Sequence, residues 1–384
     1  MTSRLAQLND LGQSPWLDNI RRDFTRSGQL RRLIDDDGLR GETSNPTIFE
    51  KAIGGSDVYD DSIKSLIAKG VTATQAVLDA LIIQDIQDAC DVFSNVYKST
   101  DRLDGYVSIE LPPDLARATQ ASIAEGRRLW KLVDRPNCYV KVPATSQGMP
   151  VIRTLISEGI NINITLMFGH EYYERVIDAF CAGLEDRLAR KQPVDHVRSV
   201  ASCFVSRIDT ETDNRLQALI SKPSDNAARA RAQGLLGKIA IANSKRLYDV
   251  FLRSVKSERF AKLKAAGARV QRPLWASTST KNPAYPDTYY VDALIGPDTV
   301  DTMPQATIDA FRDHGTVART LDTGMAEAEA DIAALEALGI SLQSVTDKLL
   351  DDGIVLFAKS WDELRQAVQK KVDALRSVSA ASKA

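Results

Sequence analysis

The sequence predicts an α/β protein, a single (β/α)8 TIM barrel with additional helices. Eight short segments rich in apolar and β-branched residues alternate with longer stretches of helical periodicity. Polar side chains recur near the carboxyl ends of these segments, where barrels carry their functional groups. The chain has 384 residues, enough for a barrel with insertions, and no glycine-rich nucleotide-binding motif favours an open sheet.

The strand segments are short and are bounded by glycine, proline or helical stretches. They are expected at residues 15–20, 41–47, 105–111, 137–147, 160–166, 197–205, 270–277 and 289–295. Helices are expected near 21–34, 56–99, 114–132, 148–158, 170–190, over most of 211–266, and over most of the chain beyond residue 300. Residues 1–376 are therefore assigned to one barrel domain with helical insertions and C-terminal helices. The small-residue stretch 377–384 is expected to be a disordered tail.

Composition excludes several classes of function. The net charge of −2 gives no field that would attract nucleic acid or an anionic membrane. The N-terminus lacks the apolar core of a signal peptide, and the four cysteines are too far apart in sequence for a disulfide framework or a zinc motif. The three histidines are also isolated, and Asp35–Asp37 is interpreted as a solvated helix end. These features predict a cytoplasmic protein without a bound metal.

Lys141 stands in the middle of a short apolar, β-branched run within residues 137–147. Side chains alternate along a strand, so Tyr139, Lys141 and Pro143 share one face. Burial disfavours the charged ammonium, and a neutral amine is a nucleophile for carbonyl carbon. The alternative is an ordinary lysine at a strand end that reaches solvent or pairs with a carboxylate.

The other polar strand-end residues favour the catalytic interpretation. A random distribution would place polar residues at the starts of strands as often as at their ends, whereas here they gather at one end. The residues concerned are Asp18, Asn45, Glu110, Lys141, Asn163, Thr165, Ser202 and Ser277.

The sequence resembles the transaldolase family. The resemblance extends over about residues 15–300, and the lysine and double-asparagine motifs are specific. It is carried by the stretches Thr43–Phe49, Tyr139–Thr145, Gly159–Leu166, Val205–Asp209 and Pro273–Thr278.

The resemblance implies a single barrel that transfers a dihydroxyacetone unit between phosphorylated sugars in the non-oxidative pentose phosphate pathway, without cofactor or metal. The implied donors are sedoheptulose 7-phosphate and fructose 6-phosphate, and the acceptors are glyceraldehyde 3-phosphate and erythrose 4-phosphate. A monomer or homodimer is expected, with no nucleic-acid or membrane partner.

The family's catalytic residues are carried over onto matching positions. Lys141 would form the Schiff base, and Asp18 would act as general acid/base at the C4 hydroxyl. Glu110 and Thr165 resemble the pair that holds a catalytic water.

The substrate-binding residues follow from the same resemblance. Asn45 and Asn163 would bind the dihydroxyacetone hydroxyls, with Ser202 and Phe204 supporting the same fragment. The phosphate candidates are Arg207, Ser277 and Lys281. Here the sequence departs from the familiar pattern, because Ser279 stands where an arginine is usual.

Three hypotheses remain open from the sequence. The first is transaldolase. The second is another Schiff-base barrel enzyme, such as a fructose 6-phosphate or deoxyribose phosphate aldolase, which would release free product. The third is a non-catalytic barrel that binds sugar phosphates or acts as a scaffold. Asn45 and Asn163 together with Glu110 and Asp18 favour the first, and the third leaves the inward polar groups without a purpose.

Overall fold

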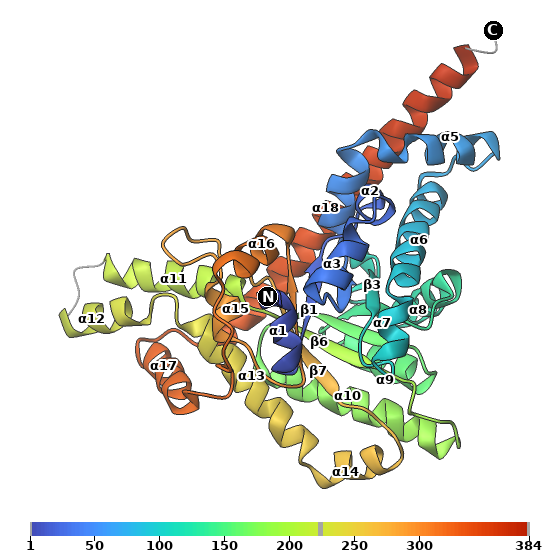
Figure 1. The fold of residues 1–384 in the computed structure, drawn as a ribbon. Helices are drawn as coiled ribbons and strands as arrows, with labels where there is room; N and C mark the ends of the chain where they lie inside the picture. The colour runs from blue at the N-terminus through green and yellow to red at the C-terminus, as the bar shows by residue number, and fades with distance from the viewer. Residues whose placement is uncertain (1, 222–225, 382–384) are drawn as a thin grey trace.

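Eight parallel strands close into a barrel in sequence order, with β8 paired to β1 (Figure 1). The computed structural model describes residues 2–221 and 226–381. The strands are β1 (Gln13–Asp18), β2 (Gly41–Thr43), β3 (Tyr106–Glu110), β4 (Cys138–Pro143), β5 (Ile162–Met167), β6 (Ser199–Phe204), β7 (Gln271–Ala276) and β8 (Thr299–Met303). The predicted barrel is therefore confirmed.

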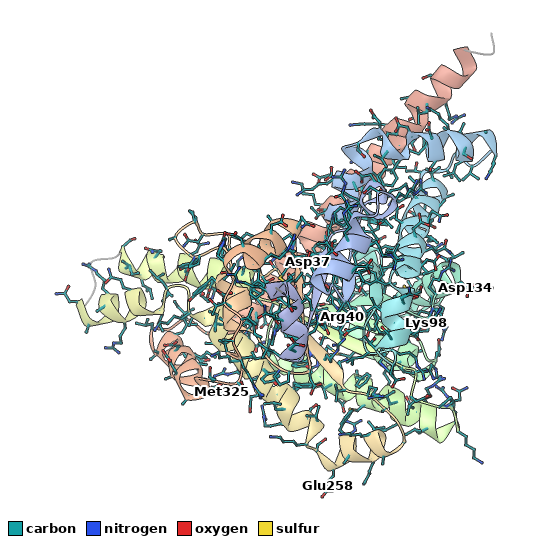
Figure 2. The ribbon with its side chains drawn as sticks, in the orientation of Figure 1. Asp37, Arg40, Lys98, Asp134, Glu258 and Met325 are labelled. Atoms are coloured by element: carbon teal, nitrogen blue, oxygen red, sulfur yellow. The ribbon has the colours of Figure 1, made fainter. Side chains whose placement is uncertain are left out.

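Helices surround the barrel and also extend beyond it. Those in the first half of the chain are α1 (Arg4–Asp10), α2 (Arg22–Arg26), α3 (Gln29–Asp37), α4 (Pro46–Phe49), the π-helix η1 (Glu50–Gly54), the 3-10 helix η2 (Asp57–Tyr59), α5 (Asp60–Ala68), α6 (Thr74–Val92), α7 (Ser94–Ser99), the 3-10 helix η3 (Pro113–Leu115), α8 (Thr119–Val133), α9 (Gly148–Ser157) and α10 (His170–Ala189). Those in the second half are α11 (Ser206–Ile220), α12 (Asn226–Leu235), α13 (Ile239–Val255), α14 (Glu258–Ala265), α15 (Tyr289–Ala293), α16 (Gln305–His314), α17 (Met325–Ala337) and α18 (Leu342–Ala381). In Figure 2 the labelled Glu258 and Met325 mark the starts of α14 and α17 at the periphery.

The predicted eighth strand, 289–295, is wrong. Its first five residues form the short helix α15, and the strand that closes the barrel comes later, at Thr299–Met303. A short apolar run cannot be assigned to helix or strand from periodicity alone. As a helix, the run buries Tyr290 and Val291. The true strand escaped notice because it carries polar side chains, Asp301 and Thr302, that are buried on its two faces.

Large side chains fill the amino-terminal half of the barrel interior. The ring of Tyr139 stacks on that of Tyr106 at a centroid distance of 4.3 Å and on Trp16 at 6.1 Å. Below them, the Arg272 guanidinium pairs with Asp104 at 2.8 Å. Because this end is packed with side chains, the space for a ligand lies at the opposite, carboxyl end of the strands.

The acidic run at the end of α3 belongs to the packed amino-terminal side. Asp35 and Asp36 are exposed, as expected for a helix end. Asp37, labelled in Figure 2, is instead buried and forms a 3.0 Å ion pair with Arg312 of α16. The interpretation of the whole run as solvated is therefore wrong at Asp37. In residues 2–221 and 226–381, no three His, Cys, Asp or Glu side chains are grouped so that they could hold a metal ion.

The C-terminal helix α18 runs along the carboxyl end of the barrel and then projects past the body beside α5 (Figure 1). It contacts α4, η1 and β5, and a side chain at Gly353 would collide with Leu166 at 2.8 Å. The helix includes residues 377–381, which the sequence analysis assigned to the tail, whereas 382–384 lie outside the described residues. Within the part of the chain that the structure describes, no helix combines the length and apolarity needed to cross a membrane.

Candidate active site

A cavity of about 380 Å³ opens at the carboxyl ends of the strands. The loops and strand ends that form it bring together side chains far apart in sequence. Of the predicted site residues, those that line it are Asp18, Asn45, Lys141, Ser202, Phe204, Arg207, Ser277 and Lys281. Glu110, Asn163 and Thr165 are not among the lining residues. Asn163 and Thr165 are fully buried, and Glu110 lies against Lys141.

Lys141 lies in a row of polar residues on three adjacent strands. Strand pairing aligns it with Glu110 on β3 and with Asn163 on β5. Its Nζ donates to the carbonyl oxygen of Ser44 at 3.0 Å and lies 3.4 Å from Oε2 of Glu110. Only 5% of Lys141 is exposed. The amine is therefore held at the cavity floor beside a carboxyl group.

Asp18, at the end of β1, is oriented by two threonines. Thr43 donates from Oγ1 to Oδ1 of Asp18 at 2.7 Å, and Thr43 also hydrogen-bonds Thr302 of β8 at 2.7 Å. Desolvation by burial raises the pKa of Asp18, and the charge of Lys141 and the Thr43 hydrogen bond partly oppose that rise. A carboxyl group with a raised pKa takes up a proton more readily than an ordinary one, which suits it to act as a base towards a bound substrate.

Glu110 has a similarly raised pKa. Burial is the main cause, the ammonium of Lys141 opposes it, and the charge of Asp18 adds to it. Nearby in the barrel wall, Thr165 is fully buried, and its Oγ1 has no hydrogen-bond partner among the described residues. A buried hydroxyl without a partner is costly unless a water or ligand satisfies it.

Asn163 is fixed by hydroxyl groups on both sides. Its Nδ2 donates to Oγ of Ser108 at 3.0 Å, and its Oδ1 accepts from Oγ of Ser202 at 2.7 Å. Asn45 caps α4, since its Oδ1 accepts from the backbone N–H of Ile48 at 3.0 Å. The cap uses the side-chain oxygen, so the Asn45 amide N–H groups remain as donors at the cavity wall.

Positive charge gathers at the outer part of the cavity. Arg207 and Lys281 line it together with Lys51 of η1. The pKa of Lys281 is lowered by burial and then by repulsion from Arg207 and Lys51. Ser277 holds a left-handed backbone conformation with φ of 58° and hydrogen-bonds Ser206 at 2.9 Å. Cations that repel one another around a cavity favour an anionic ligand.

Several residues that act at this site were not predicted from the sequence. Thr43 and Thr302 orient Asp18, Lys51 adds a cation, and Phe357 of α18 covers the cavity. Thr43 stands inside a stretch that was recognised as a motif, which was the one available signal for it. Lys51 and Phe357 lie on helices, where a lysine or an apolar residue carries no mark of function.

The arrangement can bind an anionic molecule by its charged end and bring its other end to the Lys141 amine. An amine with two carboxyl groups of raised pKa nearby can add to a carbonyl carbon and lose water, forming an imine. The charged residues at the mouth and the hydroxyl-binding amides inside would fit a phosphorylated polyol.

Comparison with known proteins gives consistent matches over nearly the whole chain. Residues 15–368 match the family described as transaldolase/fructose-6-phosphate aldolase. A transaldolase from Thermobifida fusca is 45% identical over 375 residues, which cover 97% of this chain and 100% of that protein. A transaldolase from Trichodesmium erythraeum is 42% identical over 383 residues, covering 98% of this chain and 100% of that protein. A transaldolase from Acidothermus cellulolyticus is 45% identical over 377 residues, with coverage of 98% and 99%.

Proposed function

Because the chain belongs to the transaldolase/fructose-6-phosphate aldolase family, we propose that it is a transaldolase of the non-oxidative pentose phosphate pathway. It transfers a dihydroxyacetone unit from sedoheptulose 7-phosphate or fructose 6-phosphate to glyceraldehyde 3-phosphate or erythrose 4-phosphate. The observation that carries the proposal is the buried Lys141 amine, aligned with Glu110 and Asn163 on adjacent strands. The reaction takes place in the cytoplasm, in a monomer or homodimer.

The first step joins the donor to Lys141. The amine adds to the ketose carbonyl to give a carbinolamine, which then loses water to give a protonated imine. Glu110 supplies and removes the protons that this dehydration requires, through a water held by Thr165. Oγ1 of Thr165 has no hydrogen-bond partner in the described part of the chain, which supports this role, because a water there would satisfy it.

The second step breaks the bond between C3 and C4 of the ketose. Asp18 takes the proton of the C4 hydroxyl, the C4 oxygen becomes an aldehyde, and the bonding electrons move into the iminium to give an enamine. Because the iminium receives the electron pair, the mechanism requires no Lewis-acid metal. Bond formation with the acceptor aldehyde reverses these movements, and hydrolysis then frees Lys141.

The bound three-carbon fragment must outlast the departure of the first aldehyde. Asn45 and Asn163 hold its hydroxyls, while Ser202 fixes the Asn163 amide and Phe204 packs beside it. The 2.7 Å hydrogen bond between Ser202 and Asn163 supports this assignment, because it presets the amide. Arg207, Ser277 and Lys281 bind the phosphate of donor and acceptor in turn. All three line the same cavity as Lys141, which fits a substrate whose phosphate and carbonyl group are held by different residues of one cavity.

The test of the mechanism is reduction with borohydride in the presence of fructose 6-phosphate, followed by peptide mass spectrometry. We expect a reduced three-carbon adduct on Lys141 and loss of activity. The variant Lys141→Arg should be inactive and unlabelled, because a guanidinium stays protonated. A label on Lys281, or on no lysine, would overturn the assignment.

Transfer is distinguished from simple aldol cleavage by kinetics with and without an acceptor aldehyde. We expect product formation to depend on the acceptor, with little free dihydroxyacetone. Steady release of dihydroxyacetone without an acceptor would identify an aldolase instead.

A further inference from the structure

The guanidinium of Arg207 lies against two aromatic rings that come from different parts of the chain. Its central carbon is 5.3 Å from the ring centroid of Phe204 at the end of β6. It is 5.9 Å from the ring centroid of Phe357 on α18. Both distances fall within the range at which a cation is attracted to an aromatic face. Arg207 is thus contacted from the barrel wall and from the C-terminal helix.

Among the described residues, the Arg207 side chain makes no hydrogen bond and no ion pair, and its contacts are with the two aromatic rings. Its N–H groups consequently remain available to an anion. Burial lowers the pKa of Arg207, because the guanidinium charge is partly withdrawn from water. A bound dianion would compensate that charge.

We propose that Phe357 is a positioning residue for the phosphate subsite. Through Phe357, the C-terminal helix α18 holds the Arg207 guanidinium in the orientation that binds phosphate. This inference rests on the proposed function. It gives α18 a role in substrate recognition in addition to covering the cavity.

The position of Phe357 is itself firmly held. Phe357 is 5% exposed, and α18 is joined to α4 by a 2.8 Å hydrogen bond between Ser360 and Thr47. Thr47 lies two residues after Asn45 and lines the same cavity. A rigid ring restricts the rotamers of the long arginine side chain. The guanidinium can then bind the phosphate without a large loss of side-chain conformational entropy.

The test compares Phe357→Leu, which keeps an apolar side chain but removes the ring face, with Phe357→Tyr, which keeps the ring. Val355→Ala serves as the control on the same helix, because Val355 is 70% exposed. For Phe357→Leu we expect KM for fructose 6-phosphate to rise roughly three- to thirtyfold, with kcat changed less than about twofold. Phe357→Tyr should retain the parent KM, and Val355→Ala should have the same KM and kcat as the parent.

Two further measurements separate positioning from a general structural effect. Borohydride trapping of unphosphorylated dihydroxyacetone on Lys141 should proceed equally in parent and Phe357→Leu, because this ligand has no phosphate. Binding of inorganic phosphate, measured by calorimetry, should weaken in Phe357→Leu by the same factor as KM.

An unchanged KM and unchanged phosphate affinity in a folded Phe357→Leu protein would overturn the inference. The inference would also be overturned if Phe357→Leu lost dihydroxyacetone trapping by the same factor as its KM rises, or if Phe357→Tyr did not retain the parent KM. Phosphate binding needs no turnover, so it tests the subsite even if the parent protein transfers nothing. A parent protein that transfers no three-carbon unit would contradict the proposed function and leave the phosphate subsite to be judged by the binding measurement.

Discussion

Thr43 donates a hydrogen bond of 2.7 Å to Asp18, and its own oxygen lies 2.7 Å from the hydroxyl of Thr302. The chain of three side chains links β1, β2 and β8 across the closure of the barrel. It holds the Asp18 carboxyl group in one orientation and, through the Thr43 hydrogen bond, moderates the rise in its pKa. The proposed general acid/base is therefore oriented by two threonines that come from neighbouring strands.

Asp18→Asn should separate imine formation from bond cleavage. The amide has nearly the size of the carboxyl group but cannot accept the C4 proton. We expect single-turnover aldehyde release to fall by about 10²–10⁴-fold, or roughly 3–5 kcal/mol of barrier, while borohydride still traps the donor. Cleavage within a few-fold of the parent, in protein shown to be folded, would remove Asp18 from the mechanism and make Glu110 the better candidate.

Thr43→Val should shift the pH dependence of the reaction. The hydrogen bond from Thr43 lowers the pKa of Asp18, so its loss should raise that pKa further. Asp18 must be ionised to accept a proton, and the acidic limb of the kcat profile should therefore move to higher pH. Thr43→Ser keeps the hydroxyl and should retain the parent profile. An unshifted acidic limb in Thr43→Val would show that this hydrogen bond does not tune the reaction.

Lys51→Met should weaken binding of phosphorylated substrates. Lys51 lines the cavity beside Arg207 and Lys281, and its charge contributes to lowering the pKa of Lys281. We expect a rise in KM of up to roughly fivefold, because an exposed cation contributes about 1 kcal/mol or less. The effect should diminish at high salt. Lys69→Met, which removes an exposed lysine from the end of α5, is the matched control. Equal KM values in both variants would exclude Lys51 from the subsite.

Glu42→Met should stabilise the protein more at pH 8 than at pH 5. Glu42 is fully buried, and neither carboxyl oxygen has a hydrogen-bond partner among the described residues. Burial, with a further contribution from Asp85, raises its pKa well above the ordinary value.

The folded state therefore keeps the Glu42 proton at a pH where the unfolded chain has lost it. The parent should lose stability as the pH rises from the ordinary carboxyl range, about 4.3, towards the raised folded pKa. The variant lacks this loss. Thermal unfolding at both pH values measures the difference, and a Tm gain that does not change with pH would contradict the assignment. Glu42→Gln, neutral at every pH, should remove the same pH dependence.

Much of the residue arrangement around Lys141 was predictable, because in a parallel barrel it follows from the local pattern of each strand. Alternation along a strand placed Lys141 and Tyr139 on one face, and the shared direction of the strands placed Glu110 and Asn163 at the same end. The strand pairing shows these residues side by side. The eighth strand was misplaced because burial of Asp301 and Thr302 hides the apolar pattern on which strand prediction relies.

The sequence by itself determined the barrel, the end at which its polar residues gather, and the lysine around which they are arranged. Short-range periodicity encodes these features, so they require no knowledge of distant contacts. Only the tertiary structure decided that Thr302 supports Asp18 through Thr43, that Lys51 joins the cations, and that Phe357 covers Arg207. Those contacts join segments as much as 259 residues apart. Which of many lysines or phenylalanines meets the site depends on how the outer helices pack.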